Sequence, residues 1–158
     1  MKQSIIKQIP INHGGRLHTL FGTALENDFA YFLPDYRMGI RRANSRTRLQ
    51  IATIHPRRLV LGLYSHGELV GYSICGLQAN ARAFLFWLYV VPNMRGKKLG
   101  IELLQQTEDH LKKRHVDSIE LITHNQQSFY ERHEYEMKKI MREIAAGVDM
   151  YVMIKSLK

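Results

Sequence analysis

The chain has 158 residues, of which 45% are hydrophobic, and 23 lysines and arginines against 14 acids give it a formal charge of +9. This length fits one domain and lets the chain bury roughly 70% of the surface that its unfolded form exposes, so neither a disulfide nor a structural metal is needed. The single cysteine, Cys75, excludes an internal disulfide framework and cysteine-rich zinc sites, and it favours a reducing, cytoplasmic setting. The longest apolar run, residues 83–91, is too short for a membrane helix, and the N-terminal segment lacks a signal-peptide core. We expect one domain over residues 1–158, in the cytoplasm and without membrane contact.

Hydrophobic periodicity predicts the N-terminal elements. Residues 4–9 have the pattern of a short strand, and the next apolar residues recur at helical spacing: Leu17, Leu20, Phe21, Ala24 and Leu25. A second, weaker helix is expected after Pro34, with one side formed by Tyr36, Ile40, Ala43 and Thr47. Residues 59–64 and 69–77 are rich in β-formers and predict a hairpin, in which His66 and Gly67 supply the positive φ angles of a tight turn.

The C-terminal half alternates strands and helices. Residues 83–91 (AFLFWLYVV) are apolar on both alternating faces, which predicts a central strand covered on both sides. A helix over 98–114, a strand over 118–123 and a short helix over 127–133 follow, and two last strands are expected over 135–144 and 148–157, around Ala145, Ala146 and Gly147. The order predicts one mixed α/β (α+β) domain with a mainly antiparallel sheet of six or seven strands, at least one crossover and about four helices.

The positive charge is concentrated in one segment. Residues 36–58 contain no acid and seven arginines: Arg37, Arg41, Arg42, Arg46, Arg48, Arg57 and Arg58. Such a segment predicts contact with a nucleic acid, an acidic protein or an anionic substrate, and a solvated helix face explains it equally well.

Residues 88–104 (LYVVPNMRGKKLGIELL) carry the clearest chemical signal. A buried strand ends at Pro92, a basic loop follows, and an amphipathic helix begins. The unpaired N–H groups of its first turn and the positive end of the helix dipole make an anion site that a diphosphate would fit. Gly96 and Gly100 allow close backbone approach, and Lys97 and Lys98 add charge. Neither G-x-x-x-x-G-K-[ST] nor G-x-G-x-x-G occurs, which argues against nucleoside triphosphates and dinucleotides.

This segment resembles the acetyl-CoA motif of the GNAT superfamily of N-acetyltransferases, a strand followed by [QR]-x-x-G-x-[GA]. Arg95, Gly100 and the lead-in Leu88-x-Val90-x-Pro92 match, and Lys98 stands where the family usually has glycine. If the backbone there needs a positive φ, lysine would cost on the order of 1 kcal/mol.

A second segment, residues 124–136 (HNQQSFYERHEYE), is similar to the family's region after the fifth strand. There an asparagine contacts the cofactor and a helix with the pattern F-Y-x-x-x-G-[FY] follows. The matching residues are Asn125, Phe129, Tyr130 and Tyr135, and Glu134 replaces the glycine. With the element order, the resemblance covers residues 4–157.

The resemblance implies acetyl-CoA as co-substrate and direct attack of a neutral amine on its thioester. Main-chain N–H groups would hold the pyrophosphate, and the pantetheine arm would add to the central strand where it splays from its neighbour near residues 88–90, with a strand N–H stabilising the oxyanion. Tyr130 would protonate the departing thiolate; a core tyrosine is the alternative. The implied cofactor-binding residues are Leu88, Val90, Arg95, Gly96, Lys97, Lys98, Leu99, Gly100, Ile101, Asn125 and Tyr130.

The general base is harder to assign, because residues 83–91 contain no carboxylate where many relatives carry a glutamate. His124 is the candidate; water or an amine that arrives neutral would serve instead. No histidine pair has the spacing of a metal site, so no metal is expected. Cys75 is interpreted as a buried filler rather than a nucleophile. Strand alternation turns either Phe86 and Leu88, or Trp87 and Tyr89, toward the acceptor cleft.

The leading hypothesis is an acetyl-CoA-dependent N-acetyltransferase that acts on a primary amine of a small molecule or peptide. The alternatives are a catalytically degenerate CoA-binding sensor and a basic nucleic-acid-binding module that uses residues 37–58, although no nucleic-acid-binding signature occurs. The basic segment disfavours polycationic acceptors such as aminoglycosides or polyamines. A homodimer is suggested by residues 148–157, as an apolar edge strand that needs a partner.

Overall fold

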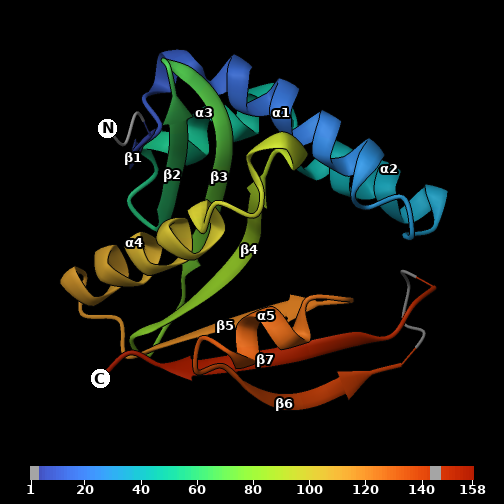
Figure 1. Ribbon diagram of the computed structural model, residues 1–158, viewed down its shortest axis with the longest axis vertical. Helices are drawn as coiled ribbons and strands as arrows, with labels where there is room; N and C mark the ends of the chain where they lie inside the picture. The colour runs from blue at the N-terminus through green and yellow to red at the C-terminus, as the bar shows by residue number, and fades with distance from the viewer. Residues whose placement is uncertain (1–3, 143–146) are drawn as a thin grey trace.

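The computed structural model describes residues 4–142 and 147–158. The described strands form one seven-stranded sheet with the order β1-β2-β3-β4-β5-β7-β6 (Figure 1). They are β1 Ser4–Gln8, β2 Arg58–Ser65, β3 Glu68–Leu77, β4 Arg82–Val90, β5 Ser118–Thr123, β6 Glu136–Met141 and β7 Met150–Ser156. Neighbours are antiparallel except β4 and β5, which are parallel because a helix crosses over between them. The expected mixed, mainly antiparallel sheet is confirmed, with β4 as its central strand.

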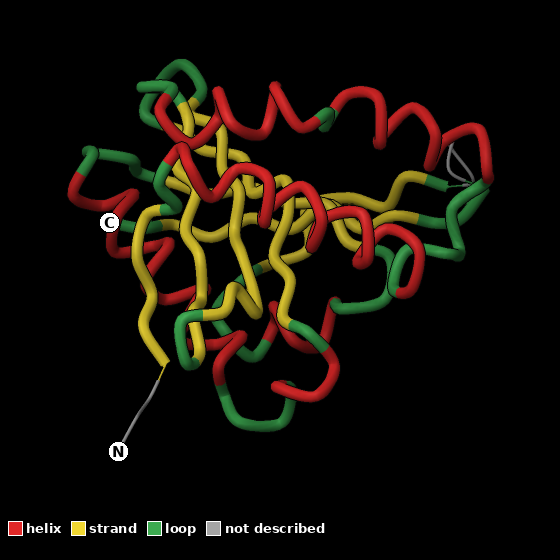
Figure 2. Tube along the Cα trace, turned by 90° about the horizontal axis from the view of Figure 1, so that it is seen from above, coloured by secondary structure: helices red, strands yellow, loops and turns green. Residues whose placement is uncertain are grey.

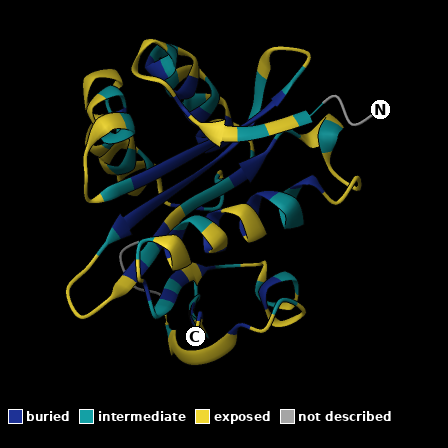
Figure 3. Ribbon diagram, turned by 90° about the vertical axis from the view of Figure 1, so that its left-hand side faces the viewer, coloured by how far each residue is buried: buried dark blue, intermediate teal, exposed yellow. Residues whose placement is uncertain are grey.

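Helices cover both faces of this sheet. The described α-helices are α1 Gly14–Asn27, α2 Pro34–Ala43, α3 Arg46–Ile54, α4 Leu99–Lys113 and α5 Gln127–Glu131, with short 3-10 helices η1 Ile11–His13 and η2 Pro92–Met94. Apolar residues of α1 and α3 pack with one set of alternating residues of β2, β3 and β4, and those of α4 and α5 pack on the opposite face. Figure 2 shows helices on both sides of the sheet, and Figure 3 shows buried strands between helices with exposed outer faces.

The single helix expected after Pro34 is in fact two helices, α2 and α3. Asn44 and Ser45 separate them because each caps a helix end. The Asn44 side-chain amide donates to the carbonyl of Ile40 at 2.9 Å, and the Ser45 hydroxyl accepts the N–H of Arg48 at 3.4 Å. The described residues therefore form five α-helices where about four were expected, and α3 turns back to pack against α1 and β2.

The final hairpin differs from the expectation in length and in position. β6 and β7 are shorter than predicted. Of the expected turn, Gly147 is described and has a φ of +75°. Residues 143–146, which include Ala145, Ala146 and the end of the strand expected over 135–144, lie outside the described residues. β7 lies between β5 and β6, so both of its edges are hydrogen-bonded. The expectation that residues 148–157 form an unpaired edge strand is wrong, and the homodimer inferred from that edge loses its basis.

Candidate active site

β4 and β5 separate halfway along their length. Their parallel pairing runs from Arg82 opposite Ser118 to Leu85 opposite Leu121, while β4 continues to Val90. Beyond Leu85 no described strand pairs with β4 on this side, and Figure 1 shows the two strands diverging. The divergence expected beside residues 88–90 is present, and it leaves one edge of the central strand open.

A row of backbone N–H groups lies where α4 begins. Before it, the N–H of Arg95 donates to Pro92, and after it the N–H of Glu102 donates to Lys98. The six N–H groups between them, of residues 96–101, donate to no backbone or side-chain group in the part of the chain that the structure describes. A Cβ at Gly96 would meet no atom within 4 Å, so the space beside the loop is open. Free donors at a helix N-terminus in open space fit a diphosphate.

Lys98 and Glu134, the two residues that replace family glycines, both have left-handed backbone conformations. Lys98 is the N-cap of α4 with φ 62° and ψ 7°, and Glu134 follows α5 with φ 69°. A positive φ costs a side-chain-bearing residue on the order of 1 kcal/mol, so the chain keeps the glycine conformation at both positions despite that cost. The turn at Lys98 is what directs the backbone from the loop into α4.

The side chain of Arg95 binds within the protein. Its Nε donates to the carbonyl of Val90 at 2.8 Å, its Nη2 lies 3.0 Å from Oδ1 of Asp28, and its guanidinium lies 5.5 Å from the ring centre of Tyr89. Arg95 therefore joins the loop to β4 and to the end of α1, and it is the backbone of the following residues that lies open.

A cavity of about 290 Å³ lies at the opening between β4 and β5, and we call it the β4–β5 cavity. The strand residues 84–88 and 121–123 form its walls, with residues 29, 31, 32, 36 and 40 on the helical side. Tyr130 of α5 also lines it and is only 8% exposed. Its ring is edge-on to those of Phe129 and Tyr135, with centres 5.1 and 5.3 Å away. Burial raises the pKa of the Tyr130 hydroxyl well above 10, so this group keeps its proton and can donate it.

His124 lines the same cavity at the end of β5. Its Nδ1 lies 2.8 Å from the carbonyl oxygen of Asp149, and its ring packs against that of Tyr31 with centres 4.5 Å apart. An N–H at Nδ1 that donates to a carbonyl leaves Nε2 with its lone pair. No Asp or Glu is among the described residues that line the cavity, so His124 is the side chain there best suited to accept a proton.

The sequence profile of the acetyltransferase (GNAT) family matches residues 24–135. The chain belongs to the GNAT family. It is an N-acetyltransferase of that family, and the match includes the loop, α4 and the segment with Tyr130. No curated protein sequence matches the chain.

Solved structures share this GNAT fold over nearly the whole chain. The PaiA N-acetyltransferase of Thermoplasma acidophilum in complex with coenzyme A has a TM-score of 0.80 at 24% identity, over 97% of this chain and 98% of that one. Aminoglycoside 6'-acetyltransferase type Ii has a TM-score of 0.79 at 18% identity, over 98% and 97% of the two chains. The ribosomal-protein-S18-alanine N-acetyltransferase of Escherichia coli has a TM-score of 0.72 at 18% identity, over 98% and 94%. At these identities the likeness establishes the fold.

The other residues expected at the GNAT cofactor site have different surroundings. Leu88 lines the β4–β5 cavity, and Asn125 is exposed at its rim. Lys97 and Lys98 are exposed beside the open N–H groups, and Gly100 and Ile101 form the first turn of α4. The side chains of Val90 and Leu99 are buried in the core, so only their backbones can reach a ligand. Cys75 is fully buried, and burial raises the pKa of its thiol, which fits the expected filler rather than a nucleophile.

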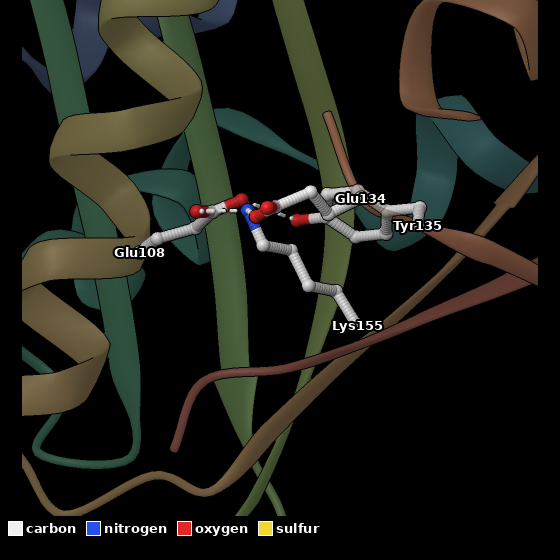
Figure 4. Close-up of polar contacts among 4 residues, drawn as sticks. All are labelled: Glu108, Glu134, Tyr135 and Lys155. Carbon is white, nitrogen blue, oxygen red and sulfur yellow. Dashed lines mark hydrogen bonds and ion pairs between the residues drawn. The ribbon is translucent and has the colours of Figure 1, made fainter. Parts of the chain in front are cut away.

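Behind Tyr130 lies a buried charged cluster that the sequence did not reveal (Figure 4). The Tyr135 hydroxyl donates to Oε1 of Glu108 at 2.9 Å, and the Lys155 ammonium lies 2.9 Å from Oε2 of Glu108. On its outer side the ammonium is 3.5 Å from the exposed carboxylate of Glu134. Glu108 is 5% exposed, on the apolar stripe of α4. The only sign of this burial in the sequence was that Glu108 lies between Leu104 and Leu111 on the leucine-rich stripe of α4. The cluster fixes Tyr135, against which the Tyr130 ring packs.

A β-bulge in β4 decides which side chains face the helices. Ile74 of β3 pairs with Trp87 but Cys75 pairs with Leu85, so Phe86 has no direct partner. The bulge thus breaks strict alternation at Phe86 only, while Trp87 and Tyr89 share the α1 and α3 face as alternation expects. Phe86 and Trp87 both face the α2 and α3 side, whereas Leu88 packs against the core on the α4 side.

The remaining expectations concern the surroundings of the protein. Among residues 4–142 and 147–158, no helix is long and apolar enough to cross a bilayer, and no three or more His, Cys, Asp or Glu side chains gather as a metal site would require. Of the seven arginines in residues 36–58, Arg41 of α2 forms an ion pair with Glu26 of α1. The cytoplasmic location and the independence from metal stay predictions.

Proposed function

We propose that this GNAT enzyme transfers the acetyl group of acetyl-CoA to a primary amine by direct attack. The observation that carries the proposal is the row of unpaired N–H groups of residues 96–101 next to the open edge of β4. The first provides donors for a diphosphate, and the second provides a strand edge along which an extended arm can add. Acetyl-CoA has both parts, and the thioester at the end of its arm would lie at the β4–β5 cavity.

The cofactor would be held mainly by backbone. Gly96, Lys97, Lys98, Leu99, Gly100 and Ile101 offer N–H groups to the pyrophosphate, and the two lysine ammonium groups add positive charge. The N–H of Val91 donates to Val70 of β3, so the alternation of a strand directs the N–H groups of Leu88 and Val90 to the open side. These two groups are the candidates to bind the pantetheine arm and the oxyanion. Asn125, at the cavity rim, would contact the same arm.

The proposed chemistry uses two side chains of the β4–β5 cavity. His124 Nε2 takes a proton from the acceptor ammonium, and the resulting amine attacks the thioester carbonyl carbon. The C–N bond forms, the C–S bond breaks, and the thiolate takes the proton of the Tyr130 hydroxyl to leave as the free thiol of CoA. The attacking nitrogen loses its second proton as the amide forms, and that proton, carried by water, restores the Tyr130 hydroxyl. The products are an N-acetyl amide and CoA, and the proton on His124 returns to solvent.

Thiol release from acetyl-CoA in the presence of a panel of primary amines tests the activity. Turnover with at least one amine supports the proposal. Acetyl-CoA binding without turnover on any amine would instead indicate a CoA-binding sensor. Salt-dependent RNA binding in the absence of acetyl-CoA binding would indicate a nucleic-acid module.

The base assignment has its own test. His124→Gln removes the proton acceptor but keeps a side chain of similar size, and we expect kcat/KM to fall by about 10²-fold. An unchanged kcat/KM in this variant would mean that water serves as the base or that the amine arrives neutral.

A further inference from the structure

A second cavity, of about 780 Å³, lies between α2, α3 and the strands, and we call it the α2–α3 cavity. Phe86, Trp87 and Ile74 form its apolar floor, because the β4 bulge turns both aromatic rings to this side. Phe86 is 42% exposed, which is unusual for a phenylalanine in a central strand. The floor therefore offers aromatic surface to a ligand.

The two cavities adjoin each other. Tyr36, Ile40, Phe86 and Trp87 line both of them. A molecule with its amine beside His124 in the β4–β5 cavity can therefore place the rest of its body in the α2–α3 cavity. The size of the larger cavity fits an organic body of several carbon atoms, since ligand sites commonly have volumes of 300–1,000 Å³.

The charged groups around the α2–α3 cavity are mostly positive. Arg48 of α3 and Arg58 of β2 line it together with His55, and among the described lining residues the single carboxylate is that of Asp35. Within the described ranges neither arginine forms an ion pair with an acid. The Arg58 guanidinium lies 4.8 Å from the ring centre of Phe86, and the Arg48 guanidinium is 3.4 Å from the carbonyl of Arg42. Two arginines thus border an aromatic floor with donors left for an anion.

The β4–β5 cavity, in contrast, offers no acidic partner among its described residues for a second positive charge. Its described lining includes tyrosines and His124 but no carboxylate, so an additional ammonium group would find no counter-ion there. An acceptor with several positive charges would leave most of them desolvated without a partner. An acceptor with one amine and one anionic group would match the charges of both cavities.

Building on the proposed function, we infer that the acceptor is a primary amine with an aromatic body and a carboxylate. The amine enters the β4–β5 cavity, the aromatic ring stacks on Phe86 and Trp87, and the carboxylate binds Arg48 and Arg58. The α2–α3 cavity is thus the specificity site of the enzyme, and these two arginines are its specificity-determining residues.

Two matched probes isolate the charge: 4-(2-aminoethyl)benzoic acid and 4-(2-aminoethyl)benzamide, with spermidine as a polycationic comparison. They differ in one group and have the same body. Thiol release gives kcat/KM for each compound. Trp87 is the only tryptophan in the chain and lines both cavities, so its fluorescence reports binding of each compound independently of turnover.

We expect the benzoate to bind more tightly than the benzamide by roughly tenfold or more, as a charge-assisted contact to arginine provides. Arg48→Gln and Arg58→Gln should each reduce that preference, and the double variant should reduce it to about twofold or less. Arg57→Gln is the matched control, because this exposed neighbour has the same charge but does not line either cavity. If Arg58→Gln fails to fold, Arg48→Gln on the exposed face of α3 carries the test.

The outcomes separate this inference from the proposed function. Equal fluorescence affinities for benzoate and benzamide, or faster turnover of spermidine, would overturn the inference while leaving an active acetyltransferase. A preference that survives in the double variant would also overturn the role of the two arginines. Absence of acetyl-CoA binding and of thiol release with any amine would overturn the proposed function itself.

Discussion

Arg95 and Asp28 form an ion pair, Nη2 to Oδ1 at 3.0 Å, that joins the loop before α4 to the end of α1. The same guanidinium donates from Nε to Val90 at 2.8 Å. The Arg95 side chain thus connects the proposed pyrophosphate loop, the open edge of β4 and the end of α1. The residues that follow α1 line the β4–β5 cavity. The arginine of the motif fixes the backbone that would bind the cofactor.

Asp28→Asn should weaken acetyl-CoA binding by several-fold, because Arg95 would hold the loop less firmly. The effect on stability should stay below about 1 kcal/mol, since both side chains are partly exposed. Calorimetric titration gives the first quantity and thermal unfolding the second. An unchanged acetyl-CoA Kd would show that the loop is fixed without this ion pair.

Lys98→Gly should stabilise the protein by roughly 1 kcal/mol, because glycine adopts the φ of 62° without the penalty that lysine carries. For a domain of this size that corresponds to a rise in Tm of about 2–4 °C. Lys97→Gly is the matched control: its residue has no positive φ, so the change should be neutral or destabilising. Equal loss of stability in both variants would contradict the strain at Lys98.

Glu108→Gln should destabilise the fold by about 3 kcal/mol, because it leaves the Lys155 ammonium, with its side chain 14% exposed, without its closest acid. The double variant Glu108→Gln with Lys155→Met should recover most of that loss, since no buried charge remains. Urea unfolding of the two single variants and the double variant measures the coupling. Additive losses would show that the two charges act independently.

Tyr130→Phe should lower kcat by roughly 10²-fold or less and leave the acetyl-CoA Kd nearly unchanged, as loss of a proton donor does. Burial disfavours the tyrosinate and so raises the pKa of Tyr130, which means that the phenol keeps its proton to higher pH than an exposed tyrosine. The wild-type enzyme should therefore show no loss of kcat from this residue below about pH 10. An alkaline limb near neutral pH that disappears in Tyr130→Phe would contradict the assignment.

Local patterns predicted much of the fold. The strand at residues 118–123 has the bounds that the sequence predicted, and His66 and Gly67 have the positive φ angles, 51° and 81°, of the expected hairpin turn. The motif also marked Lys98 as a position where a positive φ would carry a cost, and its φ is 62°. The conformation at these positions depends on a few neighbouring residues, so it can be predicted from a single sequence.

Features that depend on distant partners could not be predicted in this way. The bulge at Phe86 arises from the register between β3 and β4, and the burial of Glu108 depends on Lys155, 47 residues away. The position of β7 between β5 and β6 is a matter of sheet order, which alternation does not encode. The break between α2 and α3 could have been predicted, because Asn44 and Ser45 are both residue types that cap helices.

Calorimetric titration of acetyl-CoA into the wild-type protein, Gly100→Ala and Gly100→Pro tests the central claim most directly. Proline is tolerated in the first turn of a helix, so Gly100→Pro should fold while it removes one N–H donor, and Gly100→Ala adds a Cβ but keeps that donor. We predict that the wild-type protein binds below about 1 mM, that Gly100→Ala binds more weakly, and that Gly100→Pro loses most of its affinity. No binding by the wild-type protein at about 1 mM acetyl-CoA, or equal affinity in the proline variant, would contradict a diphosphate held by these backbone groups.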